Sequence, residues 1–156
     1  METDQNNQPA TFLKVGLASD HAGFELKEHI RIYLDTKDIP YIDYGTYTPE
    51  STNYATYGHK LAEAIEEDEV QIGIAVCATG NGINMTLNKH QHIRSALCWN
   101  EEITRLARLH NNANVMALPG RFLAPELAEK MTDIFLNTAF EGGRHQGRID
   151  AIPISC

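Results

Sequence analysis

The stretch Val70-Gln71-Ile72-Gly73-Ile74-Ala75-Val76-Cys77, continued by Ala78-Thr79-Gly80-Asn81-Gly82, decides the fold of this 156-residue chain. Residues 70–76 are apolar and almost uncharged, which is typical of a strand buried on both faces. A glycine-rich loop follows, and Met85-Thr86-Leu87 fit a first helical turn. A strand, a glycine turn and a helix in this order predict one unit of a parallel α/β sheet, where ligands bind outside the carboxyl ends of the strands.

The loop at 77–82 has the chemistry of an anion site. Its backbone N–H groups and the start of the helix after it attract negative charge. A thiol near a helix N-terminus ionises more readily than a free thiol, so Cys77 is a candidate base or nucleophile. The alternative is that Cys77 is simply a small buried residue, as free cysteines commonly are.

Three better-known loops of this kind do not match the sequence. A dinucleotide fingerprint needs a third glycine where this chain has Met85. A P-loop needs a lysine after its last glycine, and none follows Gly80 or Gly82. A cysteine phosphatase loop needs an arginine six residues after the thiol, where this chain has Ile83.

The rest of the chain alternates strand and helix patterns, which predicts a doubly wound α/β sheet. Right-handed crossovers would place Ser19-Asp20-His21, Cys77 and Cys98-Trp99 along one edge of that sheet. Polar residues 1–11 are expected to be a disordered leader, and residues 12–156 a single domain. Strands are expected at 12–18, 39–44, 70–76, 93–98 and 114–118, and helices at 24–36, 54–67, 100–110 and 125–139, with a short helix within 144–156.

The composition excludes several classes of protein. A net charge of −8 opposes nucleic-acid binding, so an anionic ligand needs a local cluster of arginine and histidine. No apolar run is long enough to span a membrane, and the N-terminus lacks the pattern of a secretory signal. Three cysteines without a CxxC pair argue against a disulfide scaffold or a zinc ribbon, and they favour a reducing, cytoplasmic compartment.

A second informative stretch, Arg144-His145-Gln146-Gly147-Arg148, follows a double glycine. If it is helical, Arg144 and Arg148 share one face, where two guanidinium groups can grip a phosphate dianion and His145 can add a third donor. The alternative is a solvated basic face. The apolar residues of the tail after Gly143 fit either an oligomer interface or docking on their own domain.

Other polar residues have both a functional and a structural interpretation. Asp20-His21 suits hydroxyl binding or proton transfer, but Asp20 also suits the cap of the next helix. His110, at the end of a helix, fits a general acid near neutral pH or a favourable C-terminal charge. His90 and His92 have the spacing of a metal pair, but no carboxylate or thiol stands near them in the sequence, so no metal site is predicted.

Several separated motifs occur in an order that resembles type B ribose-5-phosphate isomerases, a group that also includes galactose-6-phosphate isomerase subunits. The resemblance covers nearly everything from Lys14 to Ile152. The motifs are Ser-Asp-His-Ala-Gly-Phe-x-Leu-Lys at 19–27, Cys-Ala-Thr-Gly-Asn-Gly at 77–82, Asn88-Lys89, Ile93-Arg94, His110-Asn111, Asn114-Val115, Arg121 and Glu-Gly-Gly-Arg-His-Gln-x-Arg at 141–148.

This resemblance implies a Rossmann-like three-layer αβα sandwich with a five-stranded parallel sheet and no nucleotide. It implies a homodimer, or a tetramer of dimers, that needs no metal or other cofactor and builds each active site from both subunits. The implied reaction interconverts ribose 5-phosphate and ribulose 5-phosphate through an enediolate. No nucleic acid or membrane partner is implied.

The resemblance also implies roles for individual residues. Cys77 would move the proton between C1 and C2, the backbone N–H groups of Ala78, Gly80, Asn81 and Gly82 would bind the enediolate, and Thr79 would assist. His110 would help to open the furanose ring. Further contacts to the sugar phosphate are implied for Asp20, His21, Tyr54, Asn111, Arg121, Arg144, His145 and Arg148.

The chain departs from the family pattern at a few positions. Ala78 replaces a usual glycine, and its methyl group would strain the loop if φ were positive there. Asn53 and Ala55 replace a common acid and proline beside Tyr54, which bears on contacts to the distal hydroxyls. Two alternatives therefore stay open: an isomerase of a six-carbon sugar phosphate, such as allose or galactose 6-phosphate, and a non-catalytic sugar-phosphate sensor.

Overall fold

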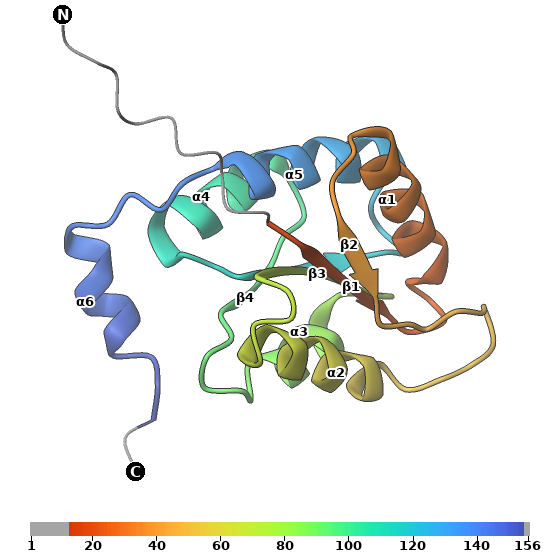
Figure 1. Ribbon diagram of the computed structural model, residues 1–156, viewed down its shortest axis with the longest axis horizontal. Coiled ribbons are helices and arrows are strands. Elements are labelled where there is room, and N and C mark those ends of the chain that lie inside the picture. Colours follow the sequence, from red (N-terminus) through yellow and green to blue (C-terminus); the bar gives the residue numbers. More distant parts are fainter. Residues whose placement is uncertain (1–12, 155–156) are drawn as a thin grey trace, which may run out of the picture.

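The computed structural model describes residues 13–154, in which strands and helices alternate along the chain (Figure 1). The predicted leader at 1–11 lies outside these residues. The strands are β1 (Val15–Ser19), β2 (Tyr41–Asp43), β3 (Ile72–Cys77), β4 (Ser95–Leu97) and β5 (Val115–Pro119). The helices are α1 (Phe24–Thr36), α2 (Tyr54–Glu66), α3 (Asn81–Leu87), α4 (Glu101–Asn111), α5 (Pro125–Asn137) and α6 (Arg144–Asp150).

The five strands form one parallel sheet in the order β2-β1-β3-β5-β4, so the predicted sheet is confirmed. From β1 the chain moves outward to β2 and then returns to the other side of β1 with β3. The carboxyl ends of β1 and β3 therefore flank the point where the winding direction reverses, which is the usual ligand site of an open α/β sheet. Asp20 and Cys77 stand at these two ends.

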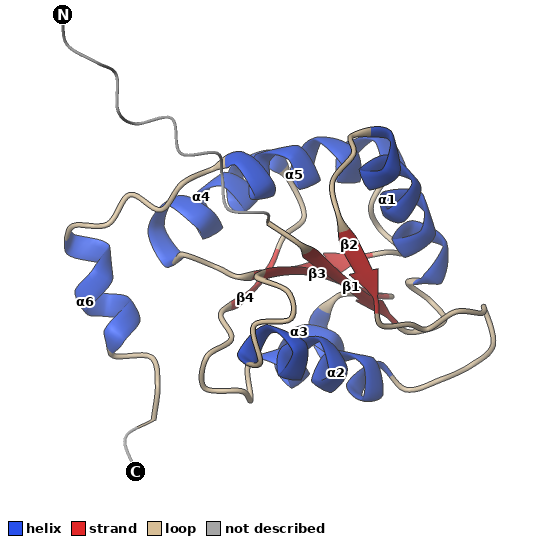
Figure 2. Ribbon diagram, viewed as in Figure 1, coloured by secondary structure: helices blue, strands red, loops and turns tan. Residues whose placement is uncertain are grey.

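Helices cover both faces of the sheet and give the predicted three layers (Figure 2). One face packs against α1, α4 and α5, with Ile30, Leu34 and Phe135 fully buried. The other face packs against α2 and α3 through Leu61 and Leu87. These side chains recur at helical spacing along amphipathic helices, which explains why the sequence pattern placed those helices well.

The start of α3 was predicted wrongly. The helix begins at Asn81, and Met85-Thr86-Leu87 form its last turn rather than its first. Gly80 has φ +76° and immediately precedes the helix, where Asn84 N donates to Gly80 O at 3.1 Å. The glycine-rich loop is therefore shorter than expected, and its second half is already helical.

The last helix, α6, stands apart from the layers and packs against α4 (Figure 1, left). His145 and Ile149 are its buried residues. Beyond it, Ile154 exchanges two backbone hydrogen bonds with the side chain of Gln91, while the side chains of Ile152 and Ile154 stay exposed. Among the described residues, no helix is both long and apolar enough to cross a membrane.

Candidate active site

The first part of the site lies at the carboxyl end of β1. Asp20 is buried, and its Oδ1 accepts a hydrogen bond from Gly23 N at 3.0 Å. Gly23 is itself the N-cap of α1 and no side chain caps this helix, so the predicted capping role of Asp20 is wrong, and its carboxylate instead holds the turn before the helix. Asp20 N donates to Val76 O at 3.2 Å, which ties this turn to β3. A methyl group on Gly23 would lie 2.3 Å from Val76 O, so only glycine allows this close approach. The motif glycine thus brings Asp20 beside the end of β3.

His21, next to Asp20, is exposed and held by the loop before α2. Thr52 N donates to His21 Nδ1 at 3.1 Å. In the tautomer that accepts this bond the proton is on Nε2, which leaves an N–H free to donate to a ligand. The backbone therefore orients the ring of a residue predicted to bind substrate.

The loop after β3 presents a thiol and free amides together. Cys77 is 3% exposed at the end of the strand, and Thr79 Oγ1 accepts from Asn81 N at 3.2 Å. Within residues 13–154, the backbone N–H groups of Ala78, Thr79 and Gly80 donate no hydrogen bond. Successive free amides beside the start of a helix form a concavity suited to an anion. The free donors lie where the anion site is predicted, but the Asn81 amide, also expected to bind the anion, already donates to Thr79 Oγ1.

Ala78 adopts no strained conformation. Among the described residues other than glycine, only Asp38, Asp68 and Asn112 have positive φ. The methyl group of Ala78 is thus compatible with its backbone, and the strain considered from the sequence does not arise.

The loop after β5 is hydrogen-bonded to the loop that follows β3. Gly120 N donates to Cys77 O at 2.9 Å, and Arg121 N donates to Ala78 O at 3.0 Å. The exposed Arg121 is therefore fixed beside the amide concavity. This places one predicted phosphate ligand next to Cys77.

Tyr54 begins α2 and covers the start of α3. A methyl group on Gly82 would lie 2.3 Å from Tyr54 Cζ, so the ring occupies the space that a larger residue would need. Asn53 Oδ1 accepts from Ala55 N at 2.9 Å and caps α2. Asn53, which replaces an acid common in the family, therefore serves as the N-cap of α2, and Tyr54 lies beside the start of α3, just after the loop that follows β3.

The second part of the site lies at the opposite edge of the sheet. Because β4 and β5 are parallel, α4 must run from the carboxyl edge back to the amino edge, and His110 and Asn111 end it there. The chain from Ala113 to Gly120 spans roughly 20 Å at about 3.3 Å per residue, so the two edges are far apart. Figure 1 shows α6 on this far side, while the arrow of β1 points away from it.

One chain therefore does not bring all the predicted site residues together. The carboxyl-edge group contains Asp20, His21, Tyr54, Cys77, Ala78, Thr79, Gly80, Asn81, Gly82 and Arg121. The amino-edge group contains His110, Asn111, Arg144, His145 and Arg148. The arginine segment belongs to the second group because α6 packs against α4.

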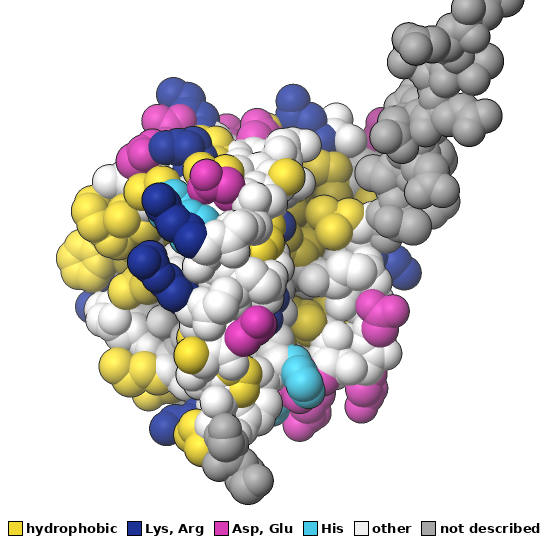
Figure 3. Space-filling view, turned by 90° about the vertical axis from the view of Figure 1, so that its left-hand side faces the viewer, with side chains coloured by type: hydrophobic (Ala, Val, Ile, Leu, Met, Phe, Trp, Pro, Cys, Tyr) yellow, Lys and Arg dark blue, Asp and Glu magenta, His cyan; other side chains and the backbone are white. Residues whose placement is uncertain are grey.

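The amino-edge group is built around a histidine pair. The rings of His110 and His145 are stacked, with centroids 4.3 Å apart and planes tilted by 16°. Glu141 Oε2 lies 3.7 Å from His110 Nε2 and 3.3 Å from His145 Nε2. Arg144 and Arg148 are exposed, one helical turn apart on α6, as predicted. Figure 3 shows basic side chains gathered beside histidine and hydrophobic side chains on this face.

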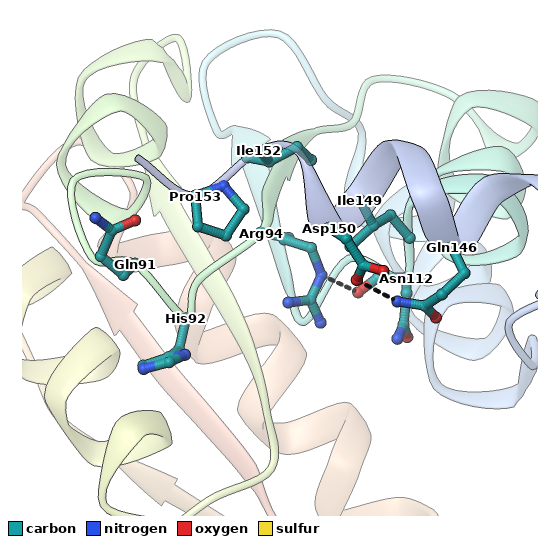
Figure 4. Close-up of a pocket in the computed structure, with 9 residues that line it drawn as sticks. All are labelled: Gln91, His92, Arg94, Asn112, Gln146, Ile149, Asp150, Ile152 and Pro153. Atoms are coloured by element: carbon teal, nitrogen blue, oxygen red, sulfur yellow. Dashed lines mark hydrogen bonds between the residues drawn. The ribbon is translucent and has the colours of Figure 1, made fainter. Parts of the chain in front are cut away.

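A cavity of about 270 Å³ lies between α6 and the segment before β4 (Figure 4). Arg94 lines it, and Arg94 Nε donates to Asn112 O at 2.9 Å. Burial lowers the pKa of the Arg94 guanidinium. The sequence shows Arg94 only as part of the motif Ile93-Arg94, because a single arginine just before a short strand gives no signal of its surroundings.

Cys98 and His90 lie outside both groups. Cys98 is fully buried, and burial raises its pKa to about 11, so its sulfur stays a thiol. No carboxylate stands near His90 in the sequence, but the fold brings one to it. Glu66 Oε1 lies 2.5 Å from His90 Nδ1, and His59 Nδ1 lies 2.8 Å from His90 Nε2. Glu66 is on α2, so its distance along the chain concealed the contact.

Comparison with known proteins agrees with this architecture. The family model described as Ribose/Galactose Isomerase matches residues 15–152. Ribose-5-phosphate isomerase B of Escherichia coli is 40% identical over 139 residues, which cover 89% of this chain and 93% of that protein.

Solved structures show the same similarity. A ribose 5-phosphate isomerase from Thermotoga maritima has a TM-score of 0.90 and 46% identity, covering 92% of this chain and 99% of that one. Ribose-5-phosphate isomerase B from Mycoplasma genitalium, solved with bound ribulose-5-phosphate, has a TM-score of 0.85 and 38% identity over 90% of this chain and 93% of its own. Sequence motifs, sheet topology and these similarities together show that the chain belongs to the ribose/galactose isomerase family.

Proposed function

We propose that the chain is an aldose–ketose isomerase that interconverts D-ribose 5-phosphate and D-ribulose 5-phosphate. One observation carries this proposal. The Cys77 thiol lies beside a concavity of backbone N–H groups that, among the described residues, donate no hydrogen bond. Enediolate chemistry needs this combination of a base and fixed dipoles. Membership of the family and the similar enzyme that binds ribulose-5-phosphate support it.

In the proposed mechanism, the Cys77 thiolate removes the proton from C2 of the open-chain aldose and the resulting thiol returns it to C1. The negative charge that develops on the enediolate oxygen is bound by the free N–H groups of Ala78, Thr79 and Gly80. One preorganised donor of this kind is worth roughly 3–4 kcal/mol, and a positioned base adds on the order of 10²–10⁴ in rate. The hydroxyl proton on O2 passes to O1 as the carbonyl moves from C1 to C2, so C1 is reduced while C2 is oxidised and no net oxidation occurs.

The sugar must first be opened and held. We assign His110 to proton transfer at the furanose ring oxygen, with Asn111 orienting the sugar and Asp20 holding a hydroxyl. Asp20 has a carboxylate oxygen fixed by Gly23 N, which supports a preorganised position.

The phosphate seat would combine Arg144, Arg148, His21 and Arg121, with His145 as a further donor. Two guanidinium forks one helical turn apart suit bidentate binding of a phosphate dianion. Phosphate binding supplies remote binding energy that holds the sugar in its reacting geometry.

We infer that a complete site needs two protomers. A homodimer, alone or within a tetramer, would place the amino-edge group of one protomer against the carboxyl-edge group of its partner. Two observations support this arrangement: the two groups stand at opposite edges of one sheet, and the tail leaves Ile152 and Ile154 exposed beside α6. Two-fold pairing repeats the same contact twice and so completes both sites.

We also infer a reducing, cytoplasmic location. Cys77 and Cys98 are free thiols, and a catalytic thiolate needs a compartment that keeps it reduced.

A coupled assay with ribose 5-phosphate, run beside allose 6-phosphate, tests the activity. We expect turnover with the five-carbon substrate, and we expect Cys77→Ala to abolish turnover while calorimetry still shows sugar-phosphate binding. Activity retained by Cys77→Ala would refute the role of the thiol. Binding without conversion by the wild-type chain would show a sensor instead.

One observation keeps a six-carbon substrate as the second candidate. The side chain of Asn53, where the family commonly has an acid, caps α2 and is not free to bind a distal hydroxyl. A higher kcat/KM with allose 6-phosphate would favour that candidate.

A further inference from the structure

Three side chains at the end of α4 converge on one point, and the proposed isomerase reaction assigns no role to one of them. These are His110 on α4, Glu141 in the loop after α5, and His145 on α6. One ligand atom from each lies within 4.8 Å of the others. The main chain at Glu141 is held beside the end of α4, since Glu141 N donates to Leu109 O at 3.0 Å. The cluster thus joins three elements through two imidazoles and one carboxylate.

The buried member of the cluster has an unsatisfied nitrogen aimed at the others. The side chain of His145 is 7% exposed, and its Nε2 has no hydrogen-bond partner within the described part of the chain. Its approach of 3.3 Å to Glu141 Oε2 lacks the geometry of a hydrogen bond. A buried polar atom without a hydrogen-bond partner destabilises the folded protein. A ligand that coordinates this nitrogen removes that cost, which favours its binding.

The spacing and the donor set fit zinc. With bonds of about 2.0–2.1 Å to nitrogen and oxygen, the ligand atoms of a tetrahedral zinc ion lie roughly 3.3 Å apart. The two distances from Glu141 Oε2, 3.3 Å to His145 Nε2 and 3.7 Å to His110 Nε2, are close to this value. Two histidines and one glutamate form a known zinc ligand set that leaves a fourth position for water.

From this geometry we propose that His110, Glu141 and His145 form an inhibitory zinc site. A zinc ion cannot lie in the planes of two stacked rings, so binding requires one ring to turn. His110 is the ring that can turn, because its side chain is 36% exposed whereas that of His145 is 7% exposed. Zinc binding therefore unstacks His110 and holds its ring on the metal, away from its proposed role in ring opening.

A second histidine cluster on the same chain gives the matched control. In the cluster of Glu66, His90 and His59, both nitrogens of His90 already have partners, at 2.5 Å and 2.8 Å. Zinc would have to break these contacts, so we expect weaker binding there. His90→Ala disrupts that cluster, and none of its three residues belongs to the proposed active site.

Calorimetry with zinc chloride tests the site on the Cys77→Ala background, where the catalytic thiol cannot bind the metal. We expect one zinc ion per chain, unchanged affinity in His90→Ala, and affinity at least tenfold weaker in Glu141→Gln. Loss of an outer-shell partner alone costs about 10- to 100-fold, and Glu141 is a direct ligand. His145→Ala should weaken binding as well.

The inhibition arm of the test rests on the proposed function. In the Cys77-containing enzyme, zinc should inhibit in competition with the sugar phosphate, and Glu141→Gln should retain turnover but resist zinc. If the wild-type chain binds zinc through Glu141 yet isomerises no sugar phosphate, the site stands and the proposed function fails. Equal zinc affinity in wild type, Glu141→Gln and His145→Ala, or loss of binding in His90→Ala alone, would overturn the site.

Discussion

At the scale of single residues, the atoms packed against Gly23 and Gly82 explain why these two motif positions are glycine. Gly23 allows Asp20 to approach β3, because its Cα faces the Val76 carbonyl. Gly82 leaves room for the Tyr54 ring. A sequence can show that a loop is rich in glycine, but it does not show which neighbour fills the space of the missing side chain.

We predict that Gly82→Ala acts on substrate binding rather than on folding. The new methyl group would displace the half-exposed Tyr54 ring, which can move without disturbing the core. Stability should change by about 1 kcal/mol or less, since alanine also favours the helix. Because Tyr54 lines the proposed pocket, KM should rise by roughly three- to tenfold with kcat less affected. Steady-state kinetics and urea denaturation measure both effects.

Gly147→Ala is the matched control for this substitution. Nothing lies within 4 Å of a methyl group at Gly147, which is inside α6. Alanine there should raise stability by about 0.5–1 kcal/mol without steric cost. An unchanged KM in Gly82→Ala would show that Tyr54 does not contribute to binding.

The candidate site was predictable from the sequence in its parts but not in its arrangement. Cys77 and Asp20 were recognised because each stands at the end of a predicted strand, where parallel sheets place ligands, whereas the role of Thr79 came from the family resemblance alone. Glu141 was missed as a partner of His110 and His145, and Glu66 as a partner of His90. Both acids lie on other elements, and contacts between elements leave no periodic pattern in a sequence.

At the scale of secondary-structure elements, α1 and β2 are joined by a buried ion pair. The side chain of Lys27 is fully buried, and Nζ lies 2.6 Å from Asp43 Oδ2 and 3.2 Å from Glu28 Oε1. Asp43 Oδ1 also accepts from Gly45 N at 2.9 Å. Helical periodicity cannot predict a buried lysine, because a charged residue on the core face breaks the pattern.

We predict that the two halves of this ion pair differ in importance for stability. Asp43→Ala leaves the Lys27 charge buried with only Glu28 nearby, and such a loss costs about 3–5 kcal/mol. Lys27→Met keeps the volume and leaves Asp43, which is 15% exposed and bonded to Gly45, so it should cost clearly less. Urea denaturation of both variants compares them. Equal losses would mean that the pair stabilises mainly through packing.

The regular elements were well predicted where periodicity is strong. The bounds of α1 match the prediction, and α2, α4 and α5 differ by one or two residues. Four of the five strands are shorter than expected, most of all β2 and β4 at the sheet edges, which pair over only three residues each, while β5 keeps its predicted length. The start of α3 was missed because glycine is a helix breaker by propensity, whereas Gly82 is tolerated for its contact with Tyr54.

At the scale of the whole molecule, the sheet separates the proposed chemistry into two groups. The thiol and the amide concavity are at one edge, and the α6 arginines are beyond the other. No rotation of side chains can close a gap of about 20 Å, since even an extended arginine is much shorter. A single sugar phosphate can therefore contact both groups only across an interface between two chains.

This separation leads to a complementation test. Cys77→Ala lacks the base, and the double variant Arg144→Ala with Arg148→Ala lacks the phosphate seat, so each alone should be nearly inactive. In a mixed dimer, one site would receive both defects and the other would receive neither. If equal amounts pair at random, half of the dimers are mixed and each has one intact site of two, so activity should recover to about a quarter of wild type. The two inactive variants are refolded together and assayed at subsaturating ribose 5-phosphate, with each refolded alone as the control. A site contained within one chain would give no recovery, because every chain in the mixture would still carry its own defect.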